Sequence, residues 1–288
     1  MKRENSVTCN EMLNYIVSRL EGAGLPEPKS DALLLMDYLA GMNRSELFIH
    51  GMDELKSDTE KKLLEALSLR LKRIPLQHIT GFQSFMGLEI KVNEHVLIPR
   101  QDTEVLVEEI LKEGSGGLRI LDVCTGSGCI LLALLHYMNG CEGVGLDISL
   151  EALKVANENS MRLGIPATFI QSDVFSGLSK DGNKYDIIVS NPPYIRSDVI
   201  PELMEEVKDH EPMIALDGHE DGLFFYRKII DESRDYLSIG GKLYFEIGYD
   251  QGEEVSNLMT DAGFKYVRVI KDLSGNDRVV TGEYPLIR

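Results

Sequence analysis

The spacing of hydrophobic residues changes twice along the chain. Over residues 1–76 the apolar positions recur every three to four residues, which is the period of an amphipathic helix. Three segments carry this pattern, residues 11–24, 29–41 and 57–75, and they end in Gly or Pro, residues that terminate helices. The pattern therefore predicts an N-terminal all-helical domain over residues 1–76.

Residues 77–100 have a different period. Leu88, Ile90 and Val92 alternate with polar residues, which is typical of a β-strand, and a Met-Gly turn precedes them. This segment is therefore expected to form a β-hairpin that links two domains. A helical pattern returns over residues 102–113.

From about residue 119 onward, short apolar segments alternate with helical ones, as in parallel sheets covered by helices on both faces. Residues 266–284 instead predict two strands joined by a turn at 274–276, hence an antiparallel edge pair. Residues 101–288 are therefore predicted to form an α/β domain with a doubly wound, mostly parallel sheet. The expected strands are residues 119–123, 143–147, 167–171, 185–190 and 241–248, and the expected helices are residues 129–138, 150–164 and 223–236.

Charge is distributed unevenly between the two predicted domains. The 288 residues carry a net charge of −17, but residues 1–76 hold 11 Lys and Arg against 12 Asp and Glu, whereas residues 77–288 hold 19 against 35. Acidic charge often serves solubility alone. Proteins that bind nucleic acids concentrate Lys and Arg on the binding face, so we expect no direct nucleic-acid partner.

The remaining composition predicts a cytoplasmic, soluble protein. The first 12 residues lack the apolar segment of a secretion signal, and the apolar run at 129–138 is shorter than the ~20 residues that span a bilayer. No membrane association is expected. No apolar seam stands out, so a monomer is the default. The four cysteines, Cys9, Cys124, Cys129 and Cys141, have neither a CxxC pair nor metal-ligand spacing, so we expect reduced thiols and no metal.

The first candidate for chemistry is the glycine-rich turn in "ILDVCTGSGCI", residues 120–130. Gly126 and Gly128 would let the backbone approach a ligand, and the helix that follows offers free N–H groups. Position 131 is Leu, so the turn is not GxGxxG, and it lacks the Lys of a phosphate-binding loop. A purely structural tight turn is the alternative.

Two acidic residues follow the next two predicted strands. Asp147 ends residues 143–147, where a carboxylate can accept hydrogen bonds from both hydroxyls of a ribose. Its alternative role is a helix cap, for which Ser149 competes. Asp173 could accept from an adenine amino group, with Val174 or Phe175 beside the ring, and a capped turn is an equal alternative. Together with the glycine-rich turn, Asp147 favours a ligand that contains a nucleoside.

The loop "NPPY", residues 191–194, follows the strand at 185–190. Asn191 offers a side-chain acceptor and Pro192 a carbonyl without an N–H, so two oxygens can converge on one NH₂ group. Tyr194 supplies a flat face for a planar amide or base, and the two prolines keep the loop rigid. Such a site selects a planar nitrogen with a delocalised lone pair. A proline-rich loop with a packed tyrosine is the structural alternative.

In this order, "LDVCTGSG", "GLD" and "SNPPY" resemble the class I S-adenosylmethionine-dependent methyltransferases that modify amino or amide nitrogen. Four longer segments resemble one family among them, the protein-(glutamine-N5) methyltransferases of peptide chain release factors. These segments are "ITGFQSFMGLEIKVNEHVLIPRQDTEVLVE", "EPMIALDGHEDGLFFYRKII", "GGKLYFEIGYDQG" and "DLSGNDRVV". The resemblance covers about residues 75–280, and an N-terminal helical domain joined by a hairpin is also that family's layout. "NPPY" alone is shared with adenine and guanine methyltransferases.

The resemblance implies a cofactor, a substrate and roles for individual residues. The cofactor would be S-adenosyl-L-methionine, with S-adenosyl-L-homocysteine as product, and the substrate would be the GGQ-loop glutamine of a release factor. The helical domain would recognise that protein. The cofactor would be held by Cys124, Thr125, Gly126, Ser127 and Gly128 at its methionine part, by Asp147 at its ribose, by Asp173 and Val174 at its adenine, and by Asn191. The glutamine carboxamide would be held by Asn191, Pro192, Pro193 and Tyr194.

Two residues depart from the family pattern. Cys124 stands where the family commonly has Gly, and Val174 stands where an aromatic residue is common. Neither change removes a group that the chemistry requires. Two other functions remain alternatives: a nucleic-acid methyltransferase acting on adenine N6 or guanine N2 through the same loop, and a non-catalytic ribosome- or factor-binding protein with a vestigial nucleotide fold.

Overall fold

The computed structural model describes residues 7–114, 116–182 and 184–285, and the chain divides into two compact units. The helical unit contains the chain through Gly81 together with the segment Glu205–His210. The α/β unit contains Phe82–Met204 and the chain from Glu211 onward. Each unit has a hydrophobic core of its own.

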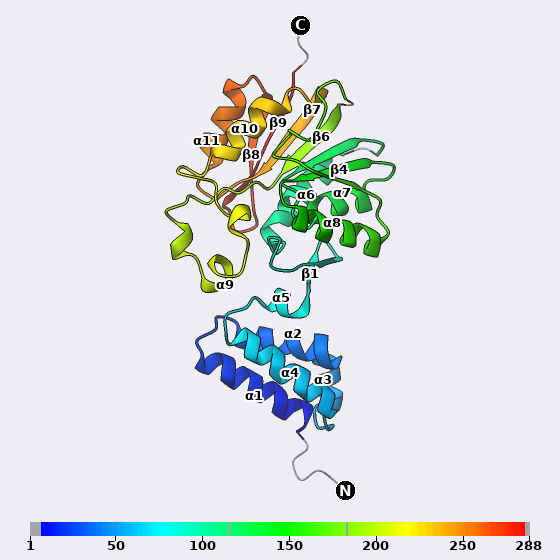
Figure 1. The fold of residues 1–288 in the computed structure, drawn as a ribbon, viewed down its shortest axis with the longest axis vertical. Coiled ribbons are helices and arrows are strands. Elements are labelled where there is room, and N and C mark those ends of the chain that lie inside the picture. The colour runs from blue at the N-terminus through cyan, green and yellow to red at the C-terminus, as the bar shows by residue number, and fades with distance from the viewer. Residues whose placement is uncertain (1–6, 115, 183, 286–288) are drawn as a thin grey trace. The chain divides into compact units, whose positions relative to one another are not determined.

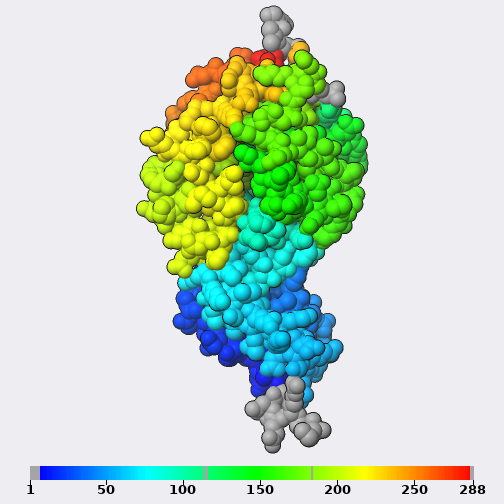
Figure 2. All heavy atoms as spheres, in the orientation of Figure 1, coloured from blue at the N-terminus to red at the C-terminus, as the bar shows by residue number. Residues whose placement is uncertain are grey.

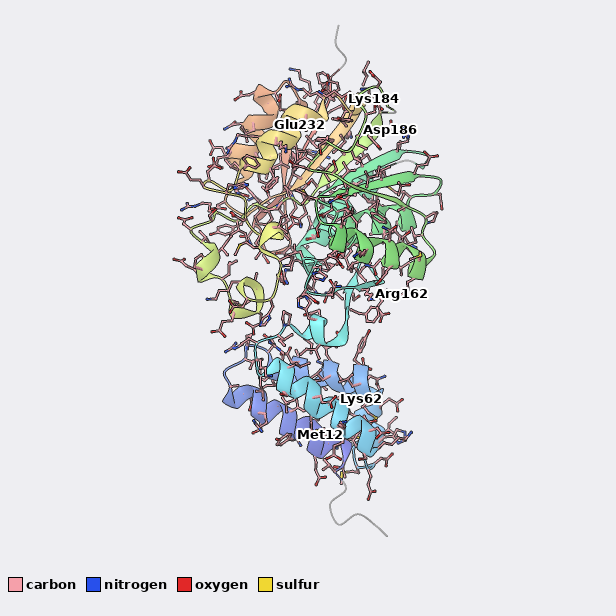
Figure 3. The ribbon with its side chains drawn as sticks, viewed as in Figure 1. Met12, Lys62, Arg162, Lys184, Asp186 and Glu232 are labelled. Carbon is pink, nitrogen blue, oxygen red and sulfur yellow. The ribbon has the colours of Figure 1, made fainter. Side chains whose placement is uncertain are left out.

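Within its described residues, the helical unit consists of helices and connecting loops, with one isolated β-bridge between Thr8 and Glu54. Its core lies between α1, α2 and α4, which correspond to the three expected helices. Met12 on α1 is buried in this core and Lys62 on α4 is exposed (Figure 3). The sequence did not predict α3 and α5, which are too short to show a period. The helices are α1 (Cys9–Gly22), α2 (Pro28–Ala40), α3 (Arg44–His50), α4 (Ser57–Arg70), α5 (Leu76–Thr80) and α9 (Glu205–Lys208).

A buried arginine holds the segment Glu205–His210 in the helical unit. The Arg70 side chain is only 6% exposed; its Nε donates to Asp31 Oδ2 at 2.7 Å and its Nη1 donates to Glu206 Oε1 at 3.1 Å. Arg73 Nη1 donates to the same Glu206 oxygen at 3.3 Å. Buried charges are tolerated only when they are paired in this way. Electrostatic pairing therefore fastens two distant parts of the sequence to each other.

The α/β unit is organised by a seven-stranded sheet with the order β5-β4-β3-β6-β7-β9-β8. The first five strands in this order are parallel, and β9 runs antiparallel to both β7 and β8. The predicted doubly wound sheet and its antiparallel C-terminal edge are thus confirmed. The strands are β3 (Arg119–Val123), β4 (Glu142–Asp147), β5 (Thr168–Gln171), β6 (Tyr185–Ser190), β7 (Leu237–Glu246), β8 (Lys265–Lys271) and β9 (Asp277–Glu283).

Helices cover both faces of this sheet (Figure 1). Alternate strand residues pack on opposite faces: Ile120 packs in the core beneath α6, α7 and α8, whereas Leu121 packs in the core beneath α10 and α11. The sequence did not predict α11. Among the described residues, no helix is both long and apolar enough to cross a membrane. The helices are α6 (Gln101–Glu113), α7 (Cys129–Tyr137), α8 (Leu150–Leu163), α10 (Phe224–Ser233) and α11 (Gly252–Asp261).

A two-stranded hairpin, β1 (Phe82–Phe85) and β2 (Leu88–Lys91), packs against α8. Met86 and Gly87 both have positive φ, as a tight two-residue hairpin turn requires. Arg162 of α8, labelled in Figure 3, lies over the Phe82 ring at 4.8 Å and donates to Glu89 at 3.0 Å. The hairpin expected from the alternating pattern is therefore present and packs within the α/β unit.

The order of strands reverses between β3 and β6. From β3 the chain proceeds outward through β4 to β5, and then returns to the other side of β3 with β6 and β7. The carboxyl ends of β3, β4 and β6 consequently meet at one edge, where open α/β sheets bind their ligands.

The buried ion pairs of the helical unit can be tested by mutation. We expect Arg70→Ala to lower the free energy of unfolding by about 3–5 kcal/mol, because it leaves the buried Asp31 carboxylate without its cation, while Glu206 keeps only Arg73. Lys61→Ala is the control, since Lys61 forms a solvent-exposed ion pair with Glu65, and such pairs contribute less than about 1 kcal/mol. Urea unfolding measures both. Equal stability of the two variants would contradict the structural role of Arg70.

Candidate active site

A pocket of about 290 Å³ lies at the carboxyl ends of β3, β4 and β6. Residues 95–99 and the segment from Pro212 to Lys228 form its remaining walls. In Figure 2 the green surface that follows β4 lies beside the yellow surface of this later segment. The expected site residues that line it are Cys124, Thr125, Gly126, Ser127, Asp147, Asp173, Val174, Asn191 and Pro193; Gly128, Pro192 and Tyr194 are not among its described lining residues.

The turn after β3 has a backbone that suits glycine. Cys124, Gly126 and Gly128 all have positive φ, at 62°, 54° and 78°. A Cβ atom on Gly126 would meet nothing within 4 Å, whereas one on Gly128 would lie 3.2 Å from both Ala156 and Phe169. Gly126 therefore borders the open pocket, and Gly128 allows the close packing of α7.

Cys124 has a left-handed backbone, a conformation that favours Gly. A Cβ atom in that conformation costs roughly 1–2 kcal/mol, which Gly avoids. Burial raises the pKa of the Cys124 thiol, and the nearby Asp147 and Asp122 raise it further. The thiol is consequently neutral and unreactive as a nucleophile at physiological pH.

Asp147 is held at the end of β4 by backbone N–H groups. Its Oδ2 accepts from Gly126 N at 2.9 Å and its Oδ1 accepts from Ser149 N at 2.9 Å. Burial raises the pKa of Asp147, and these N–H groups partly offset the shift. Ser149 Oγ accepts from Ala152 N and caps α8, so Asp147 is not the helix cap. Each carboxylate oxygen keeps acceptor capacity for a ligand.

Asp122, which the sequence did not single out, holds the same turn through a hydrogen bond to Thr125. Its side chain is fully buried, its Oδ2 accepts from Thr125 Oγ1 at 2.6 Å, and its Oδ1 has no partner among the described residues. Burial raises the pKa of Asp122 to about 7. No signal in the sequence distinguishes it from any other polar residue within a strand.

Two hydrogen bonds of the Ser172 hydroxyl shape the loop after β5. Ser172 Oγ donates to the Val174 carbonyl at 2.6 Å and accepts from Gly177 N at 2.8 Å. This arrangement holds Val174 at a φ of 53°, which a β-branched residue rarely adopts. Asp173 Oδ1 accepts from Lys228 Nζ at 2.8 Å, and both side chains line the pocket.

The suggestion that Phe175 lies beside a ligand ring is wrong. Phe175 is only 1% exposed and stacks on Tyr236, with ring centroids 4.7 Å apart and planes 6° from parallel. Hydrophobic burial therefore places this ring in the core beneath α10, and Val174 is the residue that lines the pocket.

The loop after β6 carries Asn191 on the pocket wall. Asn191 Nδ2 donates to Thr103 Oγ1 at 3.4 Å, and Tyr194 OH donates to Glu246 Oε1 at 3.4 Å. Burial, with the charge of Glu246, raises the pKa of Tyr194. Ser190 Oγ donates to the Val123 carbonyl at 2.6 Å, which ties the ends of β6 and β3 together. The side-chain oxygen of Asn191 accepts no hydrogen bond recorded within the described residues.

The segment between β6 and α10 supplies pocket residues that sequence reasoning missed, among them Ile214 and His219. Arg100 Nη2 donates to both carboxylate oxygens of the buried Glu211, at 2.6 and 2.7 Å, and fixes the segment to the start of α6. Both charged residues lie in the quoted family segments, but neither has a local pattern that indicates a role. Within the described ranges, no three His, Cys, Asp or Glu side chains form a possible metal site.

Asp122 should make stability depend on pH. Its pKa is higher in the folded chain than in the unfolded chain. Its contribution to the free energy of unfolding is therefore fully present below the pKa of the unfolded chain, and it is lost as the pH rises through about 7. Asp122→Asn resembles the protonated carboxyl, so this variant should lose less unfolding free energy between about pH 5 and about pH 8. Urea unfolding across that range measures the difference.

The matched control is Asp198→Asn, because Arg196 lowers the pKa of the exposed Asp198, which then titrates below this range. The control should keep the wild-type pH dependence. An unchanged pH dependence in Asp122→Asn would contradict the effect assigned to burial.

Comparison with known proteins agrees with this geometry. Residues 11–81 match the family described as the PrmC N-terminal domain, and residues 100–209 match the family described as the methyltransferase small domain. A methyltransferase from Pyrococcus furiosus has the same fold, with a TM-score of 0.53 at 18% identity over 80% of this chain and 100% of that one.

Two of the relatives that match over most of their length are both named release factor glutamine methyltransferase. The protein from Caulobacter vibrioides is 42% identical, covering 92% of this chain and 92% of the relative. The protein from Clostridium acetobutylicum is 41% identical, covering 87% of this chain and 89% of the relative. The resemblance of the sequence segments is thereby confirmed, and this chain belongs to the release factor glutamine methyltransferase family.

Proposed function

We propose that this enzyme transfers the methyl group of S-adenosyl-L-methionine to the side-chain amide nitrogen of the GGQ-loop glutamine in a peptide chain release factor. The product of the cofactor would be S-adenosyl-L-homocysteine. The observation that carries the proposal is Asn191, whose NH₂ group is turned to Thr103 while its side-chain oxygen has no recorded partner. This oxygen is the acceptor that a substrate NH₂ group needs.

The residues of the pocket fit such a cofactor. Open space beside Gly126 admits a ligand against the turn, and Asp147 retains acceptor capacity for ribose hydroxyls. Asp173 has a second oxygen beyond the one that Lys228 occupies, and Val174 offers an apolar contact for an adenine ring. When bound, the cofactor supplies a methyl group made electrophilic by a positive sulfur.

The NPPY loop would position the nucleophile. Asn191 Oδ1 and the Pro192 carbonyl would each accept one hydrogen of the glutamine NH₂ group, and the Tyr194 ring would contact the planar amide. When both N–H groups donate hydrogen bonds to these oxygens, electron density is drawn toward the nitrogen. This offsets the delocalisation of the nitrogen lone pair into the carbonyl group. The two prolines limit movement of the acceptors, so that positioning contributes to catalysis. After transfer, the amide proton would leave to water.

The distribution of charge supports a protein substrate. Residues 77–288 carry 19 basic against 35 acidic residues, which disfavours a nucleic-acid backbone as partner.

The proposed organisation has three parts: residues 1–76 recognise the release factor, residues 77–100 link the domains, and residues 101–288 bind the cofactor and catalyse transfer. We propose a cytoplasmic location and a monomeric state for the protein.

Methyl transfer from a labelled cofactor tests the reaction. Release factors should accept label at the GGQ glutamine, and DNA and RNA offered in parallel should not. Asn191→Ala should lower the rate at least 100-fold, because an oriented acceptor is lost, while the affinity for S-adenosyl-L-homocysteine changes less than about threefold. Label in nucleic acid, or a near-wild-type rate for Asn191→Ala, would refute the proposal.

Two glycine variants test the cofactor site. Gly126→Ala and Gly128→Ala introduce the same left-handed strain, roughly 1–2 kcal/mol each. Only the Gly126→Ala methyl enters the pocket, so this variant should lose about tenfold or more in affinity for S-adenosyl-L-homocysteine, equivalent to about 1.4 kcal/mol. Gly128→Ala should lose more stability, since its Cβ meets Ala156 and Phe169 at 3.2 Å. Calorimetry and urea unfolding separate the two effects, and a reversed order would contradict the assignment.

A further inference from the structure

The side chain of Gln251, between β7 and α11, is buried and forms hydrogen bonds in two directions. Gln251 is 9% exposed, and its Oε1 accepts from Gly248 N at 2.9 Å, within the same loop. Its Nε2 donates to the Tyr194 carbonyl at 3.1 Å and to the Gly222 carbonyl at 3.4 Å, which lie 57 and 29 residues away in the sequence. A single amide group therefore joins three segments of the α/β unit.

The orientation of this amide follows from its partners. A backbone N–H group can only donate and a carbonyl oxygen can only accept. The oxygen of Gln251 must therefore face Gly248, and its nitrogen must face Tyr194 and Gly222. A side chain that served only to close its own loop would need the acceptor alone, so the NH₂ group of Gln251 serves the two distant segments.

The peptide group between Tyr194 and Ile195 is held at both ends. Its carbonyl oxygen accepts from Gln251 Nε2 at 3.1 Å, and its N–H group donates to the Leu216 carbonyl at 3.0 Å. On the other side of Tyr194, proline rings fix φ at positions 192 and 193. The loop after β6 is therefore constrained before Tyr194 by proline and after it by hydrogen bonds.

The turn from Gly218 to Gly222 packs its backbone directly against Tyr194. A Cβ atom on Gly222, whose φ is 72°, would lie 2.5 Å from the Tyr194 carbonyl oxygen and 2.8 Å from Gln251 Nε2. A Cβ atom on Gly218 would lie 2.8 Å from Tyr194 Cα. Glycine permits this close approach, and Gln251 fastens it through a hydrogen bond to each side.

We propose that Gln251 is a positioning residue for methyl transfer, which holds the NPPY loop through Tyr194 so that the loop's oxygens meet the substrate NH₂ group. The inference rests on the proposed function of that loop. Gln251 is not among the described residues that line the pocket, so it acts through Tyr194. Without its NH₂ group, the Tyr194 carbonyl would lose a hydrogen bond in the interior, a loss that movement of the loop would relieve. Displacement by about 1 Å can cost about 100-fold in rate.

Gln251→Met and Ser160→Ala form a pair of variants for the test. Met has nearly the length and shape of Gln but no NH₂ group, so it releases Tyr194 and Gly222. Ser160→Ala removes another buried hydrogen bond of the α/β unit, from Ser160 Oγ to the Ile165 carbonyl at 2.6 Å, near the end of α8. Urea unfolding should show a lower midpoint for both variants than for the wild type, because each leaves buried carbonyl groups without a donor.

Kinetics with a release factor should distinguish the two variants. If the wild type methylates the release factor, Gln251→Met should lower kcat about tenfold or more, because the Asn191 acceptor loses its alignment. The KM for the release factor and the affinity for S-adenosyl-L-homocysteine should each change less than about threefold, since Asp147 and Gly126 lie on other loops. Ser160→Ala should keep kcat within about twofold of the wild type.

Fluorine NMR reports on Tyr194 without catalysis. In cofactor-free protein labelled with 3-fluorotyrosine, the Tyr194 signal is identified by its loss in Tyr194→Phe. This signal should shift or broaden in Gln251→Met and remain in place in Ser160→Ala. The signal of Tyr185, at the opposite end of β6, is identified through Tyr185→Phe and should stay unchanged in both variants. If urea unfolding shows that Gln251→Met does not fold, Gln251→Asn replaces it, since Asn is one methylene too short to reach both Gly248 and Tyr194.

The proposed function and the role of Gln251 can fail separately. Wild-type enzyme that methylates no release factor refutes the proposed function. If the wild type is active, an undiminished kcat in Gln251→Met, an equal loss of kcat in Ser160→Ala, or an equal loss of S-adenosyl-L-homocysteine affinity in Gln251→Met overturns the positioning role. An unchanged Tyr194 signal in Gln251→Met overturns it even when every enzyme is inactive.

Discussion

Parallel pairing of β3 with both β4 and β6 is the constraint on which the site depends. Because all three strands run in one direction, their carboxyl ends meet at one edge, and the turn after each strand can face a common ligand. The turn after β3 would otherwise be an ordinary connection, and Asp147 and Asn191 would be polar residues 44 positions apart in the sequence. The hydrophobic cores on the two faces of the sheet hold this register.

Three acidic side chains lie near this edge, and each is held differently. Asp147 is partly buried and accepts from backbone N–H groups, Asp122 is fully buried and accepts from a threonine hydroxyl, and the buried Glu246 accepts from a tyrosine near the positive charge of Arg278. Burial raises the pKa of all three carboxyl groups. The interior of the α/β unit therefore favours the neutral form of each carboxyl more than water does.

Periodicity predicted most of the architecture, because α1, α2, α4 and the strands of the sheet bury one face or both. It failed where elements are short, as in α3, and it also missed α11. Residue type and strand position were enough to place Cys124, Asp147 and Asn191 at one site. The contacts of Thr103 with Asn191 and of Glu246 with Tyr194 were not predictable, since they join α6 and β7 to the loop after β6 and no local pattern encodes them. Phe175 was misjudged because an aromatic side chain beside a ligand-binding turn can as readily belong to the core.

The segment Glu205–His210 has a consequence for dividing this protein into parts. A fragment that begins at Phe82 would keep Glu206 but lose Arg70 and Arg73, and a fragment that ends at Gly81 would keep Arg70 beside Asp31 without its second carboxylate. Truncation at the hairpin, the natural choice from the order of elements, therefore exposes charged groups on both products. The helical unit is continuous in space but not along the chain, so isolating it requires grafting the six residues of that segment onto it by a designed linker.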